Sequence, residues 1–288
     1  MSNNTIPIVT VHRGYKPYIK YNLQLTAKNN TVFVIGSLDL KFLENEIQNV
    51  KFLNIKEFSE NNDIKFYKEN FKNYSLFDNN FAWYCTERMF ILEKFMKKYK
   101  FNKVFHIDTD NVVLMDINKL NFEKNVAYHI SQFQDKFSMD ASLHSGLLDL
   151  NFCKVFNKLY EDIYINKSKF HLIEEKYLYH LNNNLKGGVC DMTMYYLINK
   201  HKLVDVQNLM KPVCDDSKNL YIFINNMNLP EGFYSKNNFR FSRKKVKIYD
   251  KKYIYDEVNE CKILIAGMHY QGTAKRHLNK FLKYKLKV

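Results

Sequence analysis

The sequence predicts an α/β fold, a mixed and mainly parallel sheet flanked by helices. Two observations favour this class. Short apolar runs rich in β-branched residues, typical of buried strands, occur at residues 6–11, 31–35 and 50–55. A stretch with helical character, residues 18–29, separates the first two runs. Strand–helix alternation of this kind is typical of parallel strands joined by helical crossovers.

The rest of the chain continues the alternation. Residues 81–99 carry apolar side chains at helical spacing. A strand-like run with Val104, Phe105 and Ile107 follows this helix. Further strands are expected at residues 112–115, 126–130, 147–150 and 262–268, and further helices at residues 152–164, at residues 191–200 and, as a short basic helix, at the end of the chain.

The loops that follow the strands are the first place to look for a site. Ligands of open α/β sheets bind beyond the carboxyl ends of the strands. Three such loops are residues 12–15, 36–37 and 108–110. Because parallel strands end at the same edge of a sheet, we expect these loops to share one rim.

Composition limits the classes of protein to consider. The chain has 288 residues, of which 46% are hydrophobic, which suits a globular core and excludes disorder. Gly and Pro are scarce, so no linker divides the chain. The net charge of +14 fits either a basic, solvated surface or attraction to nucleotides, nucleic acid or acidic lipid headgroups. No recognisable RNA- or DNA-binding module accompanies this charge, so a nucleic-acid partner is not favoured.

The cysteines and the N-terminus indicate a compartment. None of the five cysteines lies in a Cys-x-x-Cys pair, which disfavours a zinc knuckle, and an odd number of cysteines in a chain of this length disfavours a disulfide framework. The first residues lack the basic and apolar regions of a signal peptide, and no apolar run approaches the roughly 20 residues of a membrane span. We expect a cytoplasmic protein. Peripheral attachment to a membrane surface through the basic C-terminal tail stays open as an alternative.

Two carboxylates mark the end of the strand that follows residues 81–99. Asp108 and Asp110 flank Thr109 between two apolar runs. Charges at the end of a buried strand need a partner or a metal, and side chains at i and i+2 can point the same way. Mg²⁺ and Mn²⁺ prefer oxygen ligands and often bind phosphates as well. The pattern predicts a metal–diphosphate site, and the alternative is an Asp pair that caps a turn.

A second polar segment follows the apolar run at residues 262–268. His269 comes first and is followed by Gly272 and Lys275. The imidazole could complete a metal site with the aspartates, the glycine lets the backbone approach a phosphate closely, and the lysine supplies positive charge. The alternative is an ordinary loop with a hydrogen-bonded histidine.

Asp-x-Asp after a strand, followed far downstream by His-x-x-Gly-x-x-Lys, resembles the metal-dependent glycosyltransferases of the GT-A fold. The resemblance is greatest to the retaining family 8 group, which includes glycogenin, and it spans residues 6 to about 278 as spaced motifs. It implies that Asp108, Asp110 and His269 hold Mn²⁺ (or Mg²⁺) and that Lys275 contacts the diphosphate of a sugar nucleotide. Thr109 and Gly272, within the same motifs, are then expected at the donor.

The same resemblance implies further donor contacts. In the strand and loop that open the chain, it places Tyr15 on the base and Arg13 near phosphate. It also assigns a donor contact to Arg88, on the helix before the metal strand, for which a helix-surface ion pair is the alternative. Of the Asn-Ser-Gly segment that lines the donor sugar in this group, Ser145 and Gly146 are matched, whereas His144 departs from it.

Asp191 is the expected catalytic residue. The group carries Gly-Gly-Asp-Gln at the start of a helix, with the Asp and Gln beside the reacting sugar. Here Asp191 follows Gly187 and Gly188 after a two-residue insertion, and Met192 stands in place of the glutamine. That replacement weakens any transfer of the retaining mechanism. The alternative for Asp191 is a helix N-cap.

The resemblance implies a function. We expect a metal-dependent glycosyltransferase that moves a sugar from a nucleoside diphosphate sugar, with UDP-sugar favoured, to a glycan or other hydroxyl acceptor with retention. One GT-A domain would cover residues 1–288, with a nucleotide-binding half (1–125) and an acceptor-binding half that ends in the metal and diphosphate loop (126–288). Three alternatives stay open: a nucleic-acid binder or nucleotidyltransferase, a non-catalytic sugar-nucleotide binder, and an inverting enzyme with Asp191 as general base.

Overall fold

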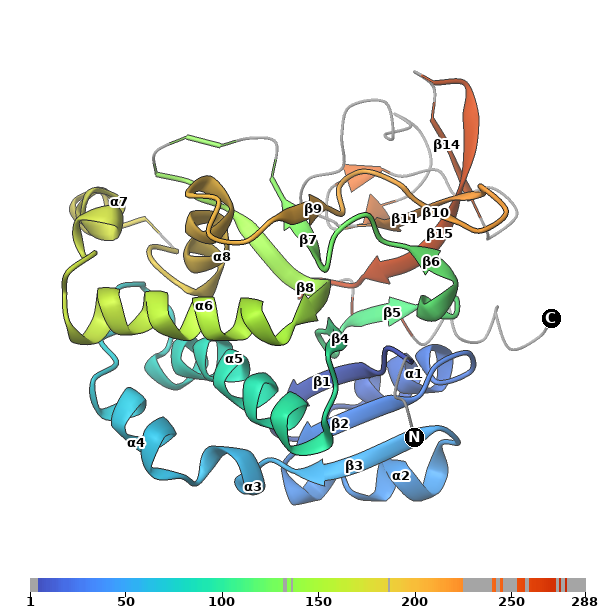
Figure 1. Ribbon diagram of the computed structural model, residues 1–288, viewed down its shortest axis with the longest axis horizontal. Coiled ribbons are helices and arrows are strands. Elements are labelled where there is room, and N and C mark those ends of the chain that lie inside the picture. Colours follow the sequence, from blue (N-terminus) through green and yellow to red (C-terminus); the bar gives the residue numbers. More distant parts are fainter. Residues whose placement is uncertain are drawn as a thin grey trace.

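The structure is a computed structural model that describes residues 5–131, 134–135, 137–185, 187–224, 240–241, 244–245, 253–256, 259–272, 275 and 278. Its helices and strands alternate along the N-terminal half and become strand-rich toward the C-terminus (Figure 1). In chain order they are β1 (Ile8–His12), α1 (Pro17–Thr26), β2 (Val32–Gly36), η1 (Leu38–Leu40), α2 (Phe42–Glu46), β3 (Val50–Asn54), α3 (Lys56–Ser59), α4 (Asn62–Glu69), α5 (Asn79–Tyr99), β4 (Lys103–Ile107), β5 (Asn111–Val113), η2 (Ile117–Lys119), β6 (Leu120–Asn121), β7 (Val126–Ile130), β8 (Ala141–Asp149), α6 (Leu150–Tyr160), the π-helical η3 (Glu161–Ile165), α7 (His171–Asn182), α8 (Asp191–Lys200), β9 (Val206–Asn208), β10 (Val213–Asp215), β11 (Leu220–Ile224), β12 (Arg240–Phe241), β13 (Lys244–Lys245), β14 (Tyr253–Asp256) and β15 (Cys261–His269).

The main sheet confirms the predicted mixed, mainly parallel α/β class. Its seven strands lie in the order β3-β2-β1-β4-β8-β7-β9. The neighbours from β3 to β4 pair in parallel, β8 runs antiparallel to both β4 and β7, and β9 is parallel to β7. The chain moves outward from β1 to β3 and then returns to the other side of β1 as β4. The strand order therefore reverses between β1 and β4, which is where open sheets bind ligands.

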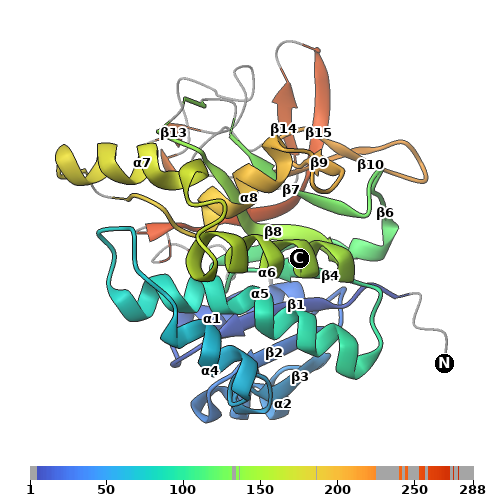
Figure 2. The same cartoon turned by 60° about the vertical axis from the view of Figure 1, so that its left-hand side comes forward.

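Both faces of β1, β2 and β4 are covered, which explains their mainly apolar sequences. Val9 and Phe33 point to the face covered by α5, while their neighbours Ile8 and Val32 point to the face covered by α1 and α2. Helices α6 and α8 extend the first layer, and α5 and α6 lie side by side (Figure 1). Helix α7 lies at the outer edge of the molecule (Figure 2).

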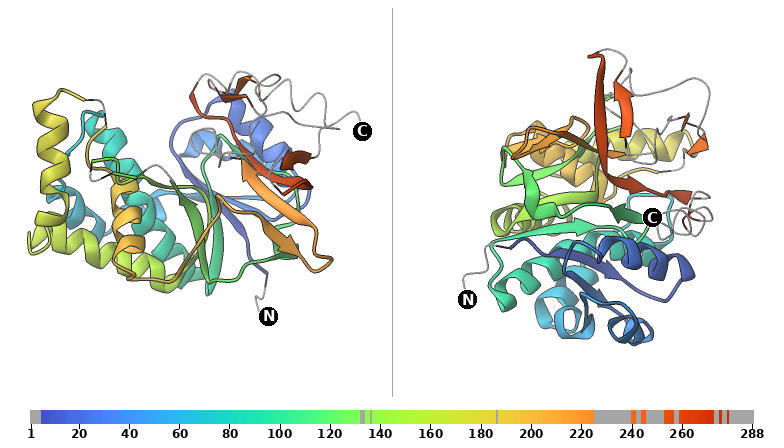
Figure 3. Two further views of the ribbon diagram at one scale, coloured as in Figure 1. Left: turned by 90° about the horizontal axis from the view of Figure 1, so that it is seen from above. Right: turned by 90° about the vertical axis from the view of Figure 1, so that its right-hand side faces the viewer.

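A second sheet lies beside the main one, on the side away from α7 (Figure 3). Its strands follow the order β14-β15-β11-β10-β6, and β5 pairs with β15 off this path. The short strand β5 comes directly after the β4 turn, so it links the aspartate-bearing end of the main sheet to the second sheet. This arrangement is what brings the C-terminal strand β15 to the candidate site.

The structure refines several predicted elements. Strand β8 begins at Ala141, earlier than predicted. Its first half escaped prediction because polar residues interrupt the apolar run there. Helix α6 begins at Leu150, since the Asp149 side chain accepts a hydrogen bond from the Phe152 N–H (2.7 Å) and caps the helix. Helices α4 and α7 and strand β11 are among the elements that were not predicted from the sequence. The basic helix predicted at the end of the chain lies outside the described residues. Within the part that is described, no helix is long and apolar enough to cross a bilayer.

Candidate functional site

The turn between β4 and β5 presents Asp108, Thr109 and Asp110 at the reversal point of the main sheet. Helix α1 fixes this turn through Asn22, whose side-chain amide donates to the carbonyls of Thr109 (2.7 Å) and Asn111 (2.9 Å). On the other side, the Asp108 N–H donates to the His144 carbonyl of β8 (2.8 Å). The backbone of the turn is thus tied to two neighbouring elements, and both carboxylates are free to face other side chains.

Strand pairing brings His269 to these carboxylates. In the antiparallel register of β5 and β15, His269 lies opposite Asn111. The next residue continues the contact, because the Tyr270 N–H donates to the Asp110 carbonyl (2.7 Å). Close approach of the strands depends on Gly267, where a Cβ would lie 2.8 Å from the Val112 carbonyl oxygen. This register explains why residues so far apart in the sequence meet.

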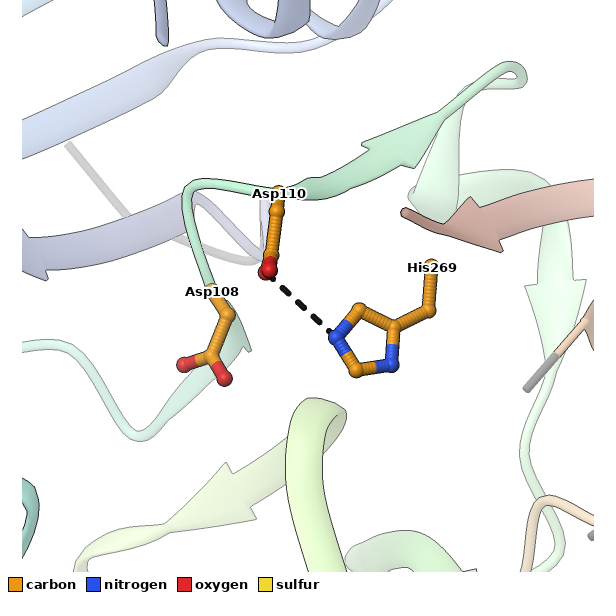
Figure 4. Close-up of side chains that lie close together, drawn as sticks. All are labelled: Asp108, Asp110 and His269. Atoms are coloured by element: carbon orange, nitrogen blue, oxygen red, sulfur yellow. Dashed lines mark ion pairs between the residues drawn. The ribbon is translucent and has the colours of Figure 1, made fainter. Parts of the chain in front are cut away.

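Asp108, Asp110 and His269 face a common space, as Figure 4 shows. One ligand atom from each lies within 4.8 Å of the other two, and Nε2 of His269 is 3.4 Å from Oδ1 of Asp110. Ligands of an octahedral ion about 2.1 Å from its centre lie roughly 3 Å apart when adjacent. Two carboxylates and an imidazole are ligand types that Mn²⁺ and Mg²⁺ accept. The side chains present therefore fit a divalent cation, and the convergence predicted from the sequence is present.

The electrostatics of Asp110 suit a cation site. Burial raises the pKa of its carboxyl, but contacts with His269 and Lys275 lower it more, so the pKa lies below its ordinary value. Lys275 Nζ is 3.0 Å from Asp110 Oδ2. Burial lowers the pKa of the Lys275 amine, and Asp110 raises it by more, so it stays a cation. Asp110 is therefore an anion that is already surrounded by positive or ligating groups.

Arg88 joins the first aspartate to Asp191. It lies midway along α5 with its side chain only 13% exposed, where it pairs with Asp108 through one terminal nitrogen and with Asp191 Oδ2 through the other (2.7 Å). The alternatives given in the sequence analysis, a helix-surface ion pair for Arg88 and a helix N-cap for Asp191, do not describe this arrangement. Arg88 is not a surface ion pair, and Asp191 is the first residue of α8, whose N-cap is Cys190.

These groups line one cleft of about 550 Å³ at the carboxyl edge of the main sheet. Its polar lining includes eight of the twelve predicted site residues, namely Arg13, Arg88, Asp108, Thr109, Asp110, Asp191, His269 and Lys275. Three contacts join the loops that form the rim of the cleft. Thr109 Oγ1 lies 3.2 Å from Nδ1 of His12. The Gly14 N–H donates to Ser37 Oγ (2.8 Å), and the Tyr15 N–H donates to Asp39 Oδ2 (2.6 Å).

Arg13 stands between this cleft and a second one. Its guanidinium pairs with Glu87 Oε2 (2.6 Å) and lies over the Tyr84 ring, 4.2 Å from the ring centroid. Glu87 is buried, which raises the pKa of its carboxyl, and Arg13 opposes that effect. The second cleft, about 620 Å³, is lined by Arg13 and Glu87 together with Lys56, Lys65 and Lys68.

Four predicted donor residues do not line the main cleft. Tyr15 packs edge-on against Phe42, with ring centroids 5.1 Å apart. Ser145 and Gly146 are buried within β8, and a Cβ at Gly146 would lie 2.7 Å from the Ala127 carbonyl oxygen of β7. Gly272 is exposed, with a positive φ of +59° that favours glycine. The donor roles of these residues stay predictions.

Several residues that shape the site have no role predicted from the sequence. For Asn22 the sequence carries a weak signal of a tertiary contact, because a buried side-chain amide on a helix needs hydrogen-bond partners outside that helix. His129 and His144, which line the cleft, interrupt apolar strands. Phe77 and Phe81 line its opening and are 44% and 56% exposed. Nothing in the local pattern of these aromatic residues separates them from core residues.

No protein-family model and no curated protein matches the sequence. Among solved structures, the chain is similar to mouse xyloside xylosyltransferase 1 in its apo form, with 10% identity over 72% of this chain and 86% of that chain and a TM-score of 0.48. It is also similar to an active-site mutant of LgtC, with 14% identity over 97% and 96% of the two chains and a TM-score of 0.46. A further similar structure is the bifunctional glycosyltransferase WbbM, with 15% identity over 97% of this chain and 49% of that chain and a TM-score of 0.48.

Proposed function

We propose that this protein is a metal-dependent glycosyltransferase that moves a sugar from a nucleoside diphosphate sugar to a glycan or other hydroxyl acceptor. The observation that carries the proposal is the convergence of Asp108, Asp110 and His269, with Lys275 beside them, in one cleft at the strand-order reversal. A cation and an amine at that place suit a diphosphate. The spacing of the same residues in the sequence gives the resemblance to the family 8 group.

The two aspartates and the histidine would hold Mn²⁺ or Mg²⁺. When bound, a divalent cation acts as a Lewis acid that offsets negative charge on the leaving diphosphate. Lys275 adds a second positive charge in the same place, beside the buried carboxylate of Asp110. Removal of one such stabilising group typically costs roughly 3–4 kcal/mol in the barrier.

Arg88 and Asp191 organise the opposite side of the cleft. Asp191 is fixed by the guanidinium of Arg88, which also binds Asp108, so the carboxylate of the proposed catalytic residue has a set distance from the proposed metal site. We assign to Asp191 the orientation of a sugar hydroxyl near the reacting carbon, since positioning of two substrates is itself a large part of such catalysis. A UDP-sugar donor and retention follow from the resemblance and belong to this proposal.

The acceptor would enter past Phe77 and Phe81. Their rings meet edge-on with centroids 5.8 Å apart, and both line the cleft while remaining about half exposed. Exposed aromatic side chains rimmed by polar groups are typical of binding sites. We place the nucleotide on residues 1–125 and the acceptor on the side formed by residues 126–288 together with this aromatic pair.

The test is turnover of a panel of UDP- and GDP-sugars with simple saccharide acceptors, in Mn²⁺ and in EDTA. We expect donor consumption that requires the metal and disappears in Asp110→Asn, while circular dichroism shows that the variant stays folded. The linkage of the product, read by proton NMR, distinguishes retention from inversion by Asp191. Turnover in EDTA would contradict the metal site.

A non-catalytic sugar-nucleotide binder is the second candidate, because Met192 lines the cleft where the resembled group has a glutamine. Such a protein would bind UDP and Mn²⁺ tightly yet neither hydrolyse nor transfer the donor sugar. Donor hydrolysis without acceptor separates the two. Salt-sensitive binding of an oligonucleotide, without any response to sugar nucleotides, would instead favour the nucleic-acid alternative.

A further inference from the structure

Three buried imidazoles form a stack behind the proposed metal site. The rings of His269 and His144 are nearly parallel, with centroids 4.2 Å apart and planes at 9°. His129 covers the other side of His144, with centroids 4.1 Å apart and planes at 32°. The residues are 7%, 2% and 1% exposed in that order and come from β15, β8 and β7, so the stack forms where the two sheets meet.

His269, the proposed metal ligand in the stack, lacks the second hydrogen bond that metal-binding histidines usually make. A metal-binding histidine nearly always donates its second ring N–H to a carboxylate, a carbonyl or water, which fixes the plane of the ring. Nδ1 of His269 is buried and has no hydrogen-bond partner among the residues that the structure describes. Its Nε2 nevertheless faces Oδ1 of Asp110 at 3.4 Å. Something other than a hydrogen bond must therefore set the plane of this imidazole.

The ring of His144 is in place to do so, and it is anchored in turn. Its Nδ1 lies 2.9 Å from Ser142 Oγ, and its backbone carbonyl accepts the Asp108 N–H. The outer ring is anchored as well, since Nε2 of His129 lies 3.2 Å from the Phe223 carbonyl oxygen of β11. Burial lowers the pKa of His129 to about 4 and that of His144 below its ordinary value, so these rings stack as neutral groups.

We propose that His144 is a positioning residue, whose ring holds the His269 imidazole in the plane that aims Nε2 at the cation shared with Asp108 and Asp110. The stack replaces the missing outer hydrogen bond. The inference rests on the proposed metal site and adds a residue to it. It also gives a physical role to His144, the position at which the chain departs from the Asn-Ser-Gly segment of the group it resembles.

The experiment measures Mn²⁺ binding without substrate, by the loss of the free Mn²⁺ signal in electron paramagnetic resonance. Outer contacts of metal ligands typically contribute 10- to 100-fold in metal affinity. We expect His144→Ala to weaken Mn²⁺ binding by about 10- to 100-fold. His144→Phe restores a flat ring and should return the affinity to within a few-fold of the wild type. His180→Ala, which removes a half-buried imidazole of α7, is the matched control and should leave Mn²⁺ binding unchanged.

The outcomes separate this inference from the proposed function. If Asp110→Asn abolishes Mn²⁺ binding and His144→Ala leaves it intact, the positioning role is overturned and the metal site stands. Equal weakening in His144→Ala and His144→Phe would also overturn it, because stacking would then not be the cause. If Asp110→Asn retains full Mn²⁺ affinity, the metal site itself is refuted. Thermal unfolding of each variant identifies one that fails to fold, in which case His144→Leu replaces His144→Ala.

Discussion

Lys275 and Asp110 form an ion pair, with Nζ 3.0 Å from Oδ2, inside the cleft that holds the candidate metal ligands. The pair joins a residue near the end of the described chain to the β4–β5 turn. Each partner changes the pKa of the other in the direction that keeps it charged, despite partial burial of both. In this arrangement the lysine is held ready for an anionic ligand beside the carboxylates rather than extended into solvent.

We expect Lys275→Gln to weaken UDP binding in the presence of Mn²⁺. A hydrogen bond to a charged group contributes about 1.5–3 kcal/mol, which corresponds to roughly 10- to 150-fold in affinity. Isothermal titration calorimetry with UDP checks the change. Lys124→Gln removes the same charge from an exposed pair with Asp205 and is the matched control. Unchanged UDP affinity in Lys275→Gln would remove this lysine from the donor site.

Arg88→Gln should destabilise the fold as well as the site. Removal of one partner of a buried ion pair leaves an uncompensated charge and typically costs about 3–5 kcal/mol. In Arg88→Gln the uncompensated charge would be the carboxylate of Asp191, because this side chain is 8% exposed and pairs with Arg88. Chemical denaturation measures the loss in the free energy of unfolding.

The double variant Arg88→Gln/Asp191→Asn is the control for this pair. It should recover part of the loss, because a neutral amide then replaces the buried carboxylate, and the effects of substituting two residues in contact are not additive. Strict additivity of the two single variants would show that the ion pair contributes nothing to stability.

The parts of the fold that sequence could predict are those determined locally. The strands that end at His12 and Ile107 are mainly apolar, and Asp108 and Asp110 stand out because they follow one of them. The register that places His269 opposite Asn111 depends on pairing between distant strands, which local pattern does not encode. The stacking of His144 on His269 is likewise a tertiary contact and is visible only once the two sheets are joined.

Two further examples show the same limit. Asn22 has the pattern of an ordinary polar residue of an amphipathic helix, although its amide fixes the backbone of the turn that carries Asp108 and Asp110. Tyr15 occupies the position expected for a residue that stacks on a base, and its ring packs on Phe42. In the first case a partner far along the chain decides the role, and in the second a neighbouring helix competes for the ring.

Stability at low pH should depend on Asp110. Because the folded protein holds the pKa of this carboxyl below its ordinary value, ionised Asp110 adds stability above the unfolded pKa of about 3.9. That contribution is lost as pH falls through the lower folded pKa. Thermal unfolding of the metal-free protein from pH 6 downward should therefore show a steeper fall below about pH 4 in the wild type than in Asp110→Asn. Parallel curves would contradict the charged state assigned to this residue.

The aromatic pair at the cleft opening gives a prediction about the acceptor. Phe81 is 56% exposed, so Phe81→Ala should change the free energy of unfolding by no more than about 0.5 kcal/mol, as is usual for surface substitutions. If the acceptor stacks on this ring, steady-state kinetics at saturating donor will show a raised acceptor KM, while the affinity for UDP and Mn²⁺ stays the same. Phe66→Ala is the matched control, since Phe66 is 50% exposed on α4 and does not line the cleft. Equal acceptor KM values in the two variants would place the acceptor elsewhere, whereas a loss of UDP affinity in Phe81→Ala would assign the ring to the donor.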